Sequence, residues 1–126
     1  MKNLDKKALL YAYLEAVLFT EADNGENDGA IANNHGYSDF STEATEQVQA
    51  DIDIFIEKAS ELLPENQESQ TGHDLWLNRN RHGSGFWDDP GTYGDYETAE
   101  KLSEIAISMG ERWAYVGDDN KIYFTK

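Results

Sequence analysis

Apolar residues recur with the 3.6-residue period of an α-helix over the first part of the chain. A first helix is predicted over residues 4–20, where apolar side chains fill most of the circumference, so we expect other elements to cover it. A second helix is predicted over 42–63, with one apolar stripe and an opposite polar face. Ser41 can cap its N-terminus, and Pro64 ends it because the residue before a proline avoids the helical conformation.

The hydrophobic period changes to two after the second helix, which indicates strands. Alternating side chains over 73–79, a glycine-rich turn and a short run over 85–88 predict one antiparallel hairpin. A second hairpin is predicted from 112–116 and 121–125, where Asn120 can adopt the left-handed conformation of the connecting turn. We expect all four strands to share one sheet.

A third helix is predicted between the two hairpins, over 96–109. Asp95 can cap its N-terminus, and Gly110 is placed to stop it. The segment 21–39 is rich in glycine, asparagine and aspartate and is predicted to be a long loop. The order α-α-β-β-α-β-β indicates an α+β fold, in which residues 1–126 form a single domain with a small, mainly antiparallel four-stranded sheet packed on helices.

Composition narrows the class of protein. The chain has no cysteine, which excludes disulfides and thiolate metal sites, and no apolar run near the ~20 residues of a membrane span. Lysines precede the apolar residues of the first helix, as in a secretory signal, but Glu15 interrupts that run and no small-residue cleavage site follows. We therefore expect a cytoplasmic protein that does not bind membranes.

Negative charge dominates the chain. Its 25 Asp and Glu residues face 10 Lys and Arg residues, a formal net charge of −15. Residues 1–70 hold 15 of the acids and 4 of the basic residues, so most of the excess lies there. Such a chain is repelled by nucleic acid and is steered toward basic protein surfaces. The simpler alternative is that the charge only maintains solubility.

Two motifs carry a family resemblance. The stretch GHDLWLNRNRHGSGFWD covers residues 72–88, and YVGDDNKIY covers 115–123. They resemble G-H-D-F-W-L-T-R-N-G-H-G-A-G-F-W-D and Y-V-G-D-D-G-x-I-Y of a family of small phage and prophage proteins. The resemblance implies a phage accessory protein and no particular activity. The chain departs from the motifs at Leu75, Asn78, Arg81, Ser84 and Asn120.

The first predicted hairpin offers an alternative ligand or active site. Its side chains could line a concave site that binds a nucleotide or phosphate, or they could form the active site of a metal-dependent enzyme. Against this, the histidine spacing matches no metal signature, Ser84 lacks the context of a nucleophile, and no helix or lysine follows the glycines. The residues of this alternative site are His73, Trp76, Arg79, His82, Trp87 and Asp88.

The favoured interpretation of the same hairpin is structural. Trp76, or its neighbour Leu77, is expected to be buried, because large aromatic side chains dominate the energetics of small cores. Arg79 is expected to pair with Asp88 or to stack on a tryptophan. We expect no cofactor and no metal, and we do not expect an enzyme.

The second predicted helix carries the main functional hypothesis. A helical wheel places five of its acids within an arc of about 80°, opposite the apolar stripe. The spacing of the last three is about 6 Å along the axis, close to that of phosphates along one DNA strand. Only Lys58 lies nearby, whereas ordinary solvated faces mix both signs. The five acids are Glu43, Glu46, Asp53, Glu57 and Glu61.

We therefore expect a DNA-mimic-like inhibitor that acts in host takeover or against host defence. Together with Asp23 and Asp28 of the loop, the five acids would bind the basic, nucleic-acid-binding surface of a host defence, repair or transcription protein. The protein would be a monomer or a small homo-oligomer and would not bind nucleic acid itself. A phage protein that binds only another phage protein is a further alternative.

Overall fold

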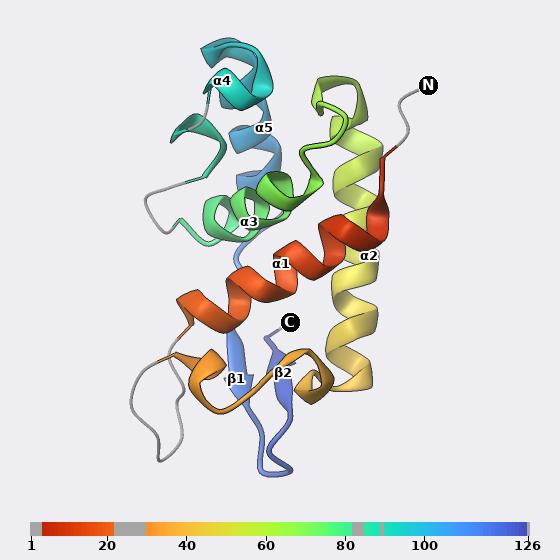
Figure 1. The fold of residues 1–126 in the computed structure, drawn as a ribbon, viewed down its shortest axis with the longest axis vertical. Helices are drawn as coiled ribbons and strands as arrows, with labels where there is room; N and C mark the ends of the chain where they lie inside the picture. Colours follow the sequence, from red (N-terminus) through yellow and green to blue (C-terminus); the bar gives the residue numbers. More distant parts are fainter. Residues whose placement is uncertain (1–3, 22–29, 82–84, 89, 126) are drawn as a thin grey trace.

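The protein is mostly helical, and a small hairpin lies toward the lower end of the molecule in Figure 1. The computed structural model describes residues 4–21, 30–81, 85–88 and 90–125. Within these residues, the elements in chain order, with η for a 3-10 helix, are α1 Lys6–Thr20, η1 Ile31–Asn33, η2 Tyr37–Asp39, α2 Thr42–Ala59, η3 Ser60–Leu62, α3 Glu68–Arg79, η4 Phe86–Asp88, α4 Pro90–Tyr93, α5 Tyr96–Ser108, β1 Ala114–Val116 and β2 Ile122–Phe124.

Side-chain caps mark the starts of α1, α2 and α5, and the helices predicted around 4–20 and 96–109 are confirmed as α1 and α5. The Ser41 hydroxyl accepts a hydrogen bond from the backbone N–H of Ala44 at the start of α2. Asp95 caps α5 in the same way. Gly110, with φ of 84°, follows α5 in the left-handed conformation that its position predicts.

The second predicted helix is shorter than expected. The α-helix ends at Ala59, and a 3-10 turn, η3, continues to Leu62 before Pro64. In the predicted loop 21–39, the short helices η1 and η2 form after the segment 22–29, which lies outside the described residues.

The second predicted hairpin is confirmed. Strands β1 and β2 pair antiparallel, with Tyr115 opposite Tyr123, as expected for 112–116 and 121–125. Asn120 has φ of 64°, the left-handed conformation that the turn requires. The backbone N–H of Ser41 donates to the carbonyl of Ile122, so the hairpin is attached to the start of α2.

The prediction of a first hairpin is wrong, and so is the prediction of a four-stranded sheet. Residues 73–79 lie in α3, the return strand is replaced by η4, and the described residues contain a single sheet of two strands. Alternation indicates a strand only where the polar positions face water. In α3, both polar and apolar side chains are buried, because the buried polar side chains form hydrogen bonds within the protein. The buried residues of α3 are Thr71, Gly72, Asp74, Leu75, Trp76, Asn78 and Arg79.

Trp76 is central to the core, so its predicted burial is confirmed. Its ring packs edge-on against Tyr13 of α1 and Phe124 of β2, with ring centroids 5.3 and 5.8 Å apart. The indole N–H donates to the Thr20 hydroxyl at 2.9 Å, so burial leaves no polar atom of the ring unpaired.

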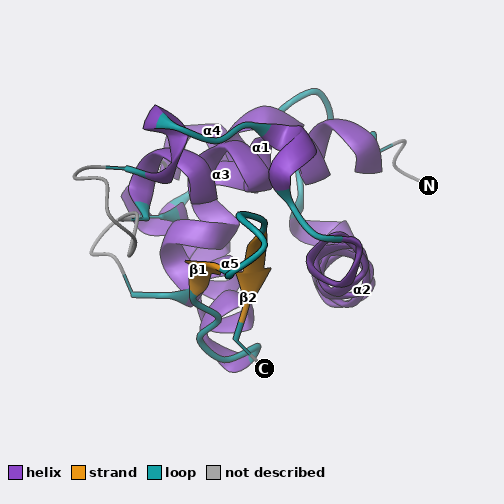
Figure 2. Ribbon diagram, turned by 90° about the horizontal axis from the view of Figure 1, so that it is seen from below, coloured by secondary structure: helices purple, strands orange, loops and turns teal. Residues whose placement is uncertain are grey.

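Helices α1, α2 and α3 all contribute side chains to this core. Helix α1 packs most extensively on α3, and it runs across α2 rather than along it (Figure 1). Figure 2 looks along α2, which stands at one side of the molecule, and α2 contacts both strand β2 of the hairpin and α5. One face of α2 therefore packs inward, while the opposite face meets solvent.

The contact between α1 and α3 requires a glycine. A Cβ atom added at Gly72 would lie 2.5 Å from the carbonyl oxygen of Leu9 and 2.6 Å from the Cβ of Ala12. Both are atoms of α1 that cannot move without the helix. The close approach of the two backbones is what allows Trp76, one turn further along α3, to reach the core.

We predict that Gly72→Ala lowers the free energy of unfolding by about 1–3 kcal/mol, because the overpacking cost exceeds the gain in helix propensity. Gly91→Ala in α4 is the matched control, since an added Cβ there meets no atom within 4 Å. Urea unfolding of both variants checks the prediction. Equal stability of the two variants would contradict the close packing of α1 on α3.

Candidate functional site

The acidic ridge, which we define as Glu43, Glu46, Asp53, Glu57 and Glu61, lies on the solvent side of α2 and η3, and all five residues are exposed. The described residues contain an ion partner for Asp53, since Lys6 Nζ lies 3.0 Å from its Oδ1. Glu61 falls on the 3-10 turn, so the regular spacing of about 6 Å joins Asp53 and Glu57 but does not extend to Glu61. The loop acids Asp23 and Asp28 lie outside the described residues.

The acidic surface continues from the ridge onto the hairpin. Glu43 lines a shallow hollow of about 410 Å³ together with Asp118 and Asp119 of the turn and the tyrosines of the two strands. The rings of Tyr115 and Tyr123 stack with centroids 5.8 Å apart. The Tyr123 hydroxyl donates to Asp119, and this hydrogen bond raises the pKa of the tyrosine and lowers that of the carboxyl. Three carboxylates therefore gather at the N-terminal end of α2.

One acid of α2 points the other way. The Asp51 carboxylate is buried, with Arg79 Nη1 and Arg112 Nε each 2.7 Å from its Oδ2. A second bond from Arg112 reaches Oδ1 at 3.2 Å. Asp51 is not among the residues predicted to be important, although the sequence contains a signal for its burial: on the helical wheel it lies beside the apolar stripe of Val48 and Phe55 and not on the ridge.

The prediction that Arg79 pairs with Asp88 is therefore wrong. The Arg79 guanidinium donates hydrogen bonds to Asp51 and to the Tyr13 hydroxyl at 3.2 Å. It also donates to the backbone carbonyls of Met109 and Gly110. Burial raises the pKa of Tyr13 to about 12. Asp88 instead accepts from the backbone N–H of Gly85.

The other described residues of the alternative hairpin site do not come together in one site, and His82 lies outside the described residues. His73 contacts Glu15 of α1, with Nε2 2.8 Å from Oε1, whereas the Trp76 indole is in the core. Trp87 is 46% exposed on η4. Among the described residues, no three His, Asp or Glu side chains are placed to hold a metal ion.

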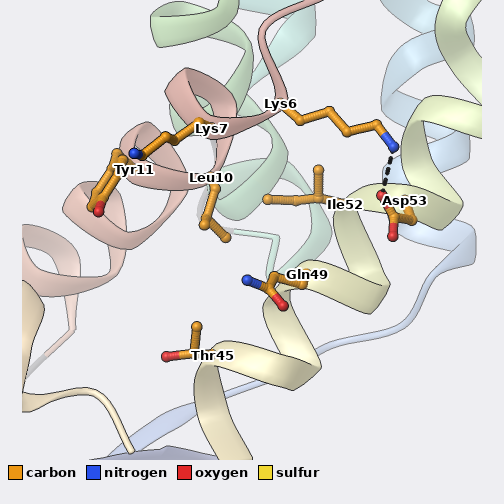
Figure 3. A pocket seen from close by; sticks show the side chains of 8 residues that line it. All are labelled: Lys6, Lys7, Leu10, Tyr11, Thr45, Gln49, Ile52 and Asp53. Atoms are coloured by element: carbon orange, nitrogen blue, oxygen red, sulfur yellow. Dashed lines mark hydrogen bonds and ion pairs between the residues drawn. The ribbon is translucent and has the colours of Figure 1, made fainter. Parts of the chain in front are cut away.

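A groove between α1 and α2 borders the ridge and has a volume of about 470 Å³ (Figure 3). Leu10 and Ile52 point into it from the two helices, and polar side chains surround them. Asp53 belongs both to this groove and to the ridge. The groove could not be predicted from the sequence, because it depends on how α1 crosses α2. The residues that line it are Lys6, Lys7, Leu10, Tyr11, Thr45, Gln49, Ile52 and Asp53.

Comparison of the chain with models of protein families, with curated proteins and with solved structures finds no match. None of the helices in the described part of the chain combines the length and hydrophobicity that a bilayer crossing requires. The ridge, the hollow and the groove are therefore the features of the molecule that bear on its function.

We predict that Asp51→Asn lowers the free energy of unfolding by about 3–5 kcal/mol, because it leaves two guanidinium groups without their anion. Asp53→Asn makes the same chemical change two residues away, in an exposed ion pair, and should cost less than about 1 kcal/mol. Urea unfolding of both variants at neutral pH measures the difference. Similar losses in the two variants would show that the buried pairs do not anchor α2.

The raised pKa of Tyr13 predicts a loss of stability in alkali. Between pH 10 and 12 the unfolded chain releases the Tyr13 proton, whereas the folded chain keeps it. The contribution of Tyr13 to the free energy of unfolding is therefore fully present below pH 10 and declines as the pH rises toward 12. Tyr13→Phe should therefore lose stability less steeply than the parent over this window. Urea unfolding at successive pH values measures both slopes, with the exposed Tyr96→Phe as control. Parallel curves for Tyr13→Phe and the parent would contradict the prediction.

Proposed function

We propose that the protein is an acidic binding module whose ridge engages a basic surface of another protein. The observation that carries the proposal is that all five ridge acids are exposed on one side of the molecule. Glu43, Glu46 and Glu57 make no ion pair within the described residues. Like charges that are held together and left unpaired repel each other, and a basic partner removes this repulsion.

The shape of the ridge favours recognition by charge over copying of a regular phosphate array. Lys6 neutralises part of Asp53, and Glu61 departs from the helical spacing. The hollow at the hairpin adds Asp118 and Asp119 beside Glu43, which lengthens the acidic surface. Surfaces that bind nucleic acid are rich in lysine and arginine, so a nucleic-acid-binding protein is the class of partner that fits. The resemblance to phage proteins favours a host protein as that partner.

The proposal predicts an association that is fast at low salt and slows as salt rises, because exposed charges are screened over the ~8–10 Å Debye length. Glu46→Lys combined with Glu57→Lys should reduce capture of the basic partner at least tenfold and flatten its salt dependence. These two residues lie outside the groove, so the groove is left intact. Pull-down from host lysate at low and high salt, followed by competition with DNA for the captured protein, measures both effects.

A matched control lies on α5. Glu100→Lys combined with Glu104→Lys changes the net charge by the same amount, again at two exposed helical positions. This variant should capture the partner nearly as well as the parent. If both double variants lose capture equally, net charge alone is responsible. If neither does, the ridge is an ordinary solvated helix face.

A further inference from the structure

The groove between α1 and α2 is lined by two lysines in a chain whose net charge is strongly negative. Lys6 and Lys7 line it, although the chain carries a net charge of −15. Both lysines lie in the first turn of α1, where the helix dipole disfavours cations, and that turn contains no acid. Asp53 compensates Lys6, with 3.0 Å between the charged atoms. Lys7 has no hydrogen-bond or ion-pair partner among the described residues.

The interior of the groove is apolar, in contrast to its rim. Ile52 is buried and forms the floor, while Leu10 is half-buried and forms a wall (Figure 3). The ring of Tyr11 stands 43% exposed beside Lys7. The Gln49 amide is exposed and can donate or accept a hydrogen bond. An occupant that matches this lining has an apolar body and one anionic end.

We propose that this groove binds a small amphipathic carboxylate, with its charged end at Lys7 and its apolar body over Leu10 and Ile52. The volume of 470 Å³ lies within the range of roughly 300–1,000 Å³ typical of small-molecule sites. A free small molecule fits this space better than a protein segment, since a stable protein interface covers about 800 Å² on each partner. The site shares Asp53 with the ridge, but Glu46 and Glu57 do not line it, so the two kinds of binding can be tested by different variants.

The test uses decanoate as the probe, titrated into the ¹⁵N-labelled protein below its micelle concentration and followed by amide chemical shifts. Shifts should concentrate on residues of the groove, including Leu10, Gln49 and Ile52. Decanol, which has the same chain without the charge, should bind at least tenfold more weakly, because a hydrogen-bonded charge contributes more than about 1.4 kcal/mol. Decyltrimethylammonium, with the opposite charge, should not produce these shifts.

Two variants and one control decide the outcome. Lys7→Glu should weaken decanoate at least tenfold, and Gln49→Trp, which fills the groove from an exposed position of α2, should abolish binding. Lys58→Glu makes the same charge change as Lys7→Glu at an exposed position outside the groove and should bind like the parent. Circular dichroism confirms that each variant is folded.

Each other outcome overturns the proposal. Equal binding of decanoate and decanol would mean that the lysines do not recognise an anion. Equal weakening by Lys7→Glu and Lys58→Glu would indicate a general charge effect. Shifts outside the groove, or no shifts at all, would show that the groove is not a site. These outcomes do not bear on the proposed function. If decanoate does not bind but the basic partner is still captured, only the groove proposal fails. The variant that combines Glu46→Lys and Glu57→Lys tests the proposed function without changing the groove.

Discussion

The buried carboxylate of Asp51 is the constraint on which the rest of the structure depends. It accepts hydrogen bonds from Arg79 of α3 and from Arg112 just before β1, and Arg79 in turn contacts Tyr13 of α1. Four parts of the chain meet at one charge. A buried anion without partners is strongly destabilising. The positions of α3, of Arg112 and of α2 are therefore fixed relative to one another by the need to pair this carboxylate.

The same carboxylate fixes which side of α2 faces solvent. Because Asp51 points inward, Asp53 and Glu57 must point outward, since residues on a helix are separated by 100° each. Ile52 then falls between the two directions and becomes the floor of the groove. The ridge and the groove are thus consequences of one rotation of α2, and Asp53 lies where they meet.

Features set by local signals could be predicted from the sequence. The N-caps of α2 and α5, the stop at Gly110, the turn at Asn120 and the exposure of the ridge all depend on residues within one or two turns. Helix α3 could not be predicted, because its buried polar residues are satisfied by distant partners: Asp74 by Tyr93 and Asn78 by Ser103. Alternation of such residues with apolar ones looks like a strand until those partners are known.

The separation of the charged partners along the chain has a consequence for biosynthesis. Asp51 lies 28 residues before Arg79 and 61 residues before Arg112. During translation, α1 and α2 emerge from the ribosome with an inward-facing carboxylate that has neither guanidinium available. The carboxylate therefore gains its first guanidinium when α3 has left the exit tunnel, and its second only when Arg112, just before the hairpin, has followed.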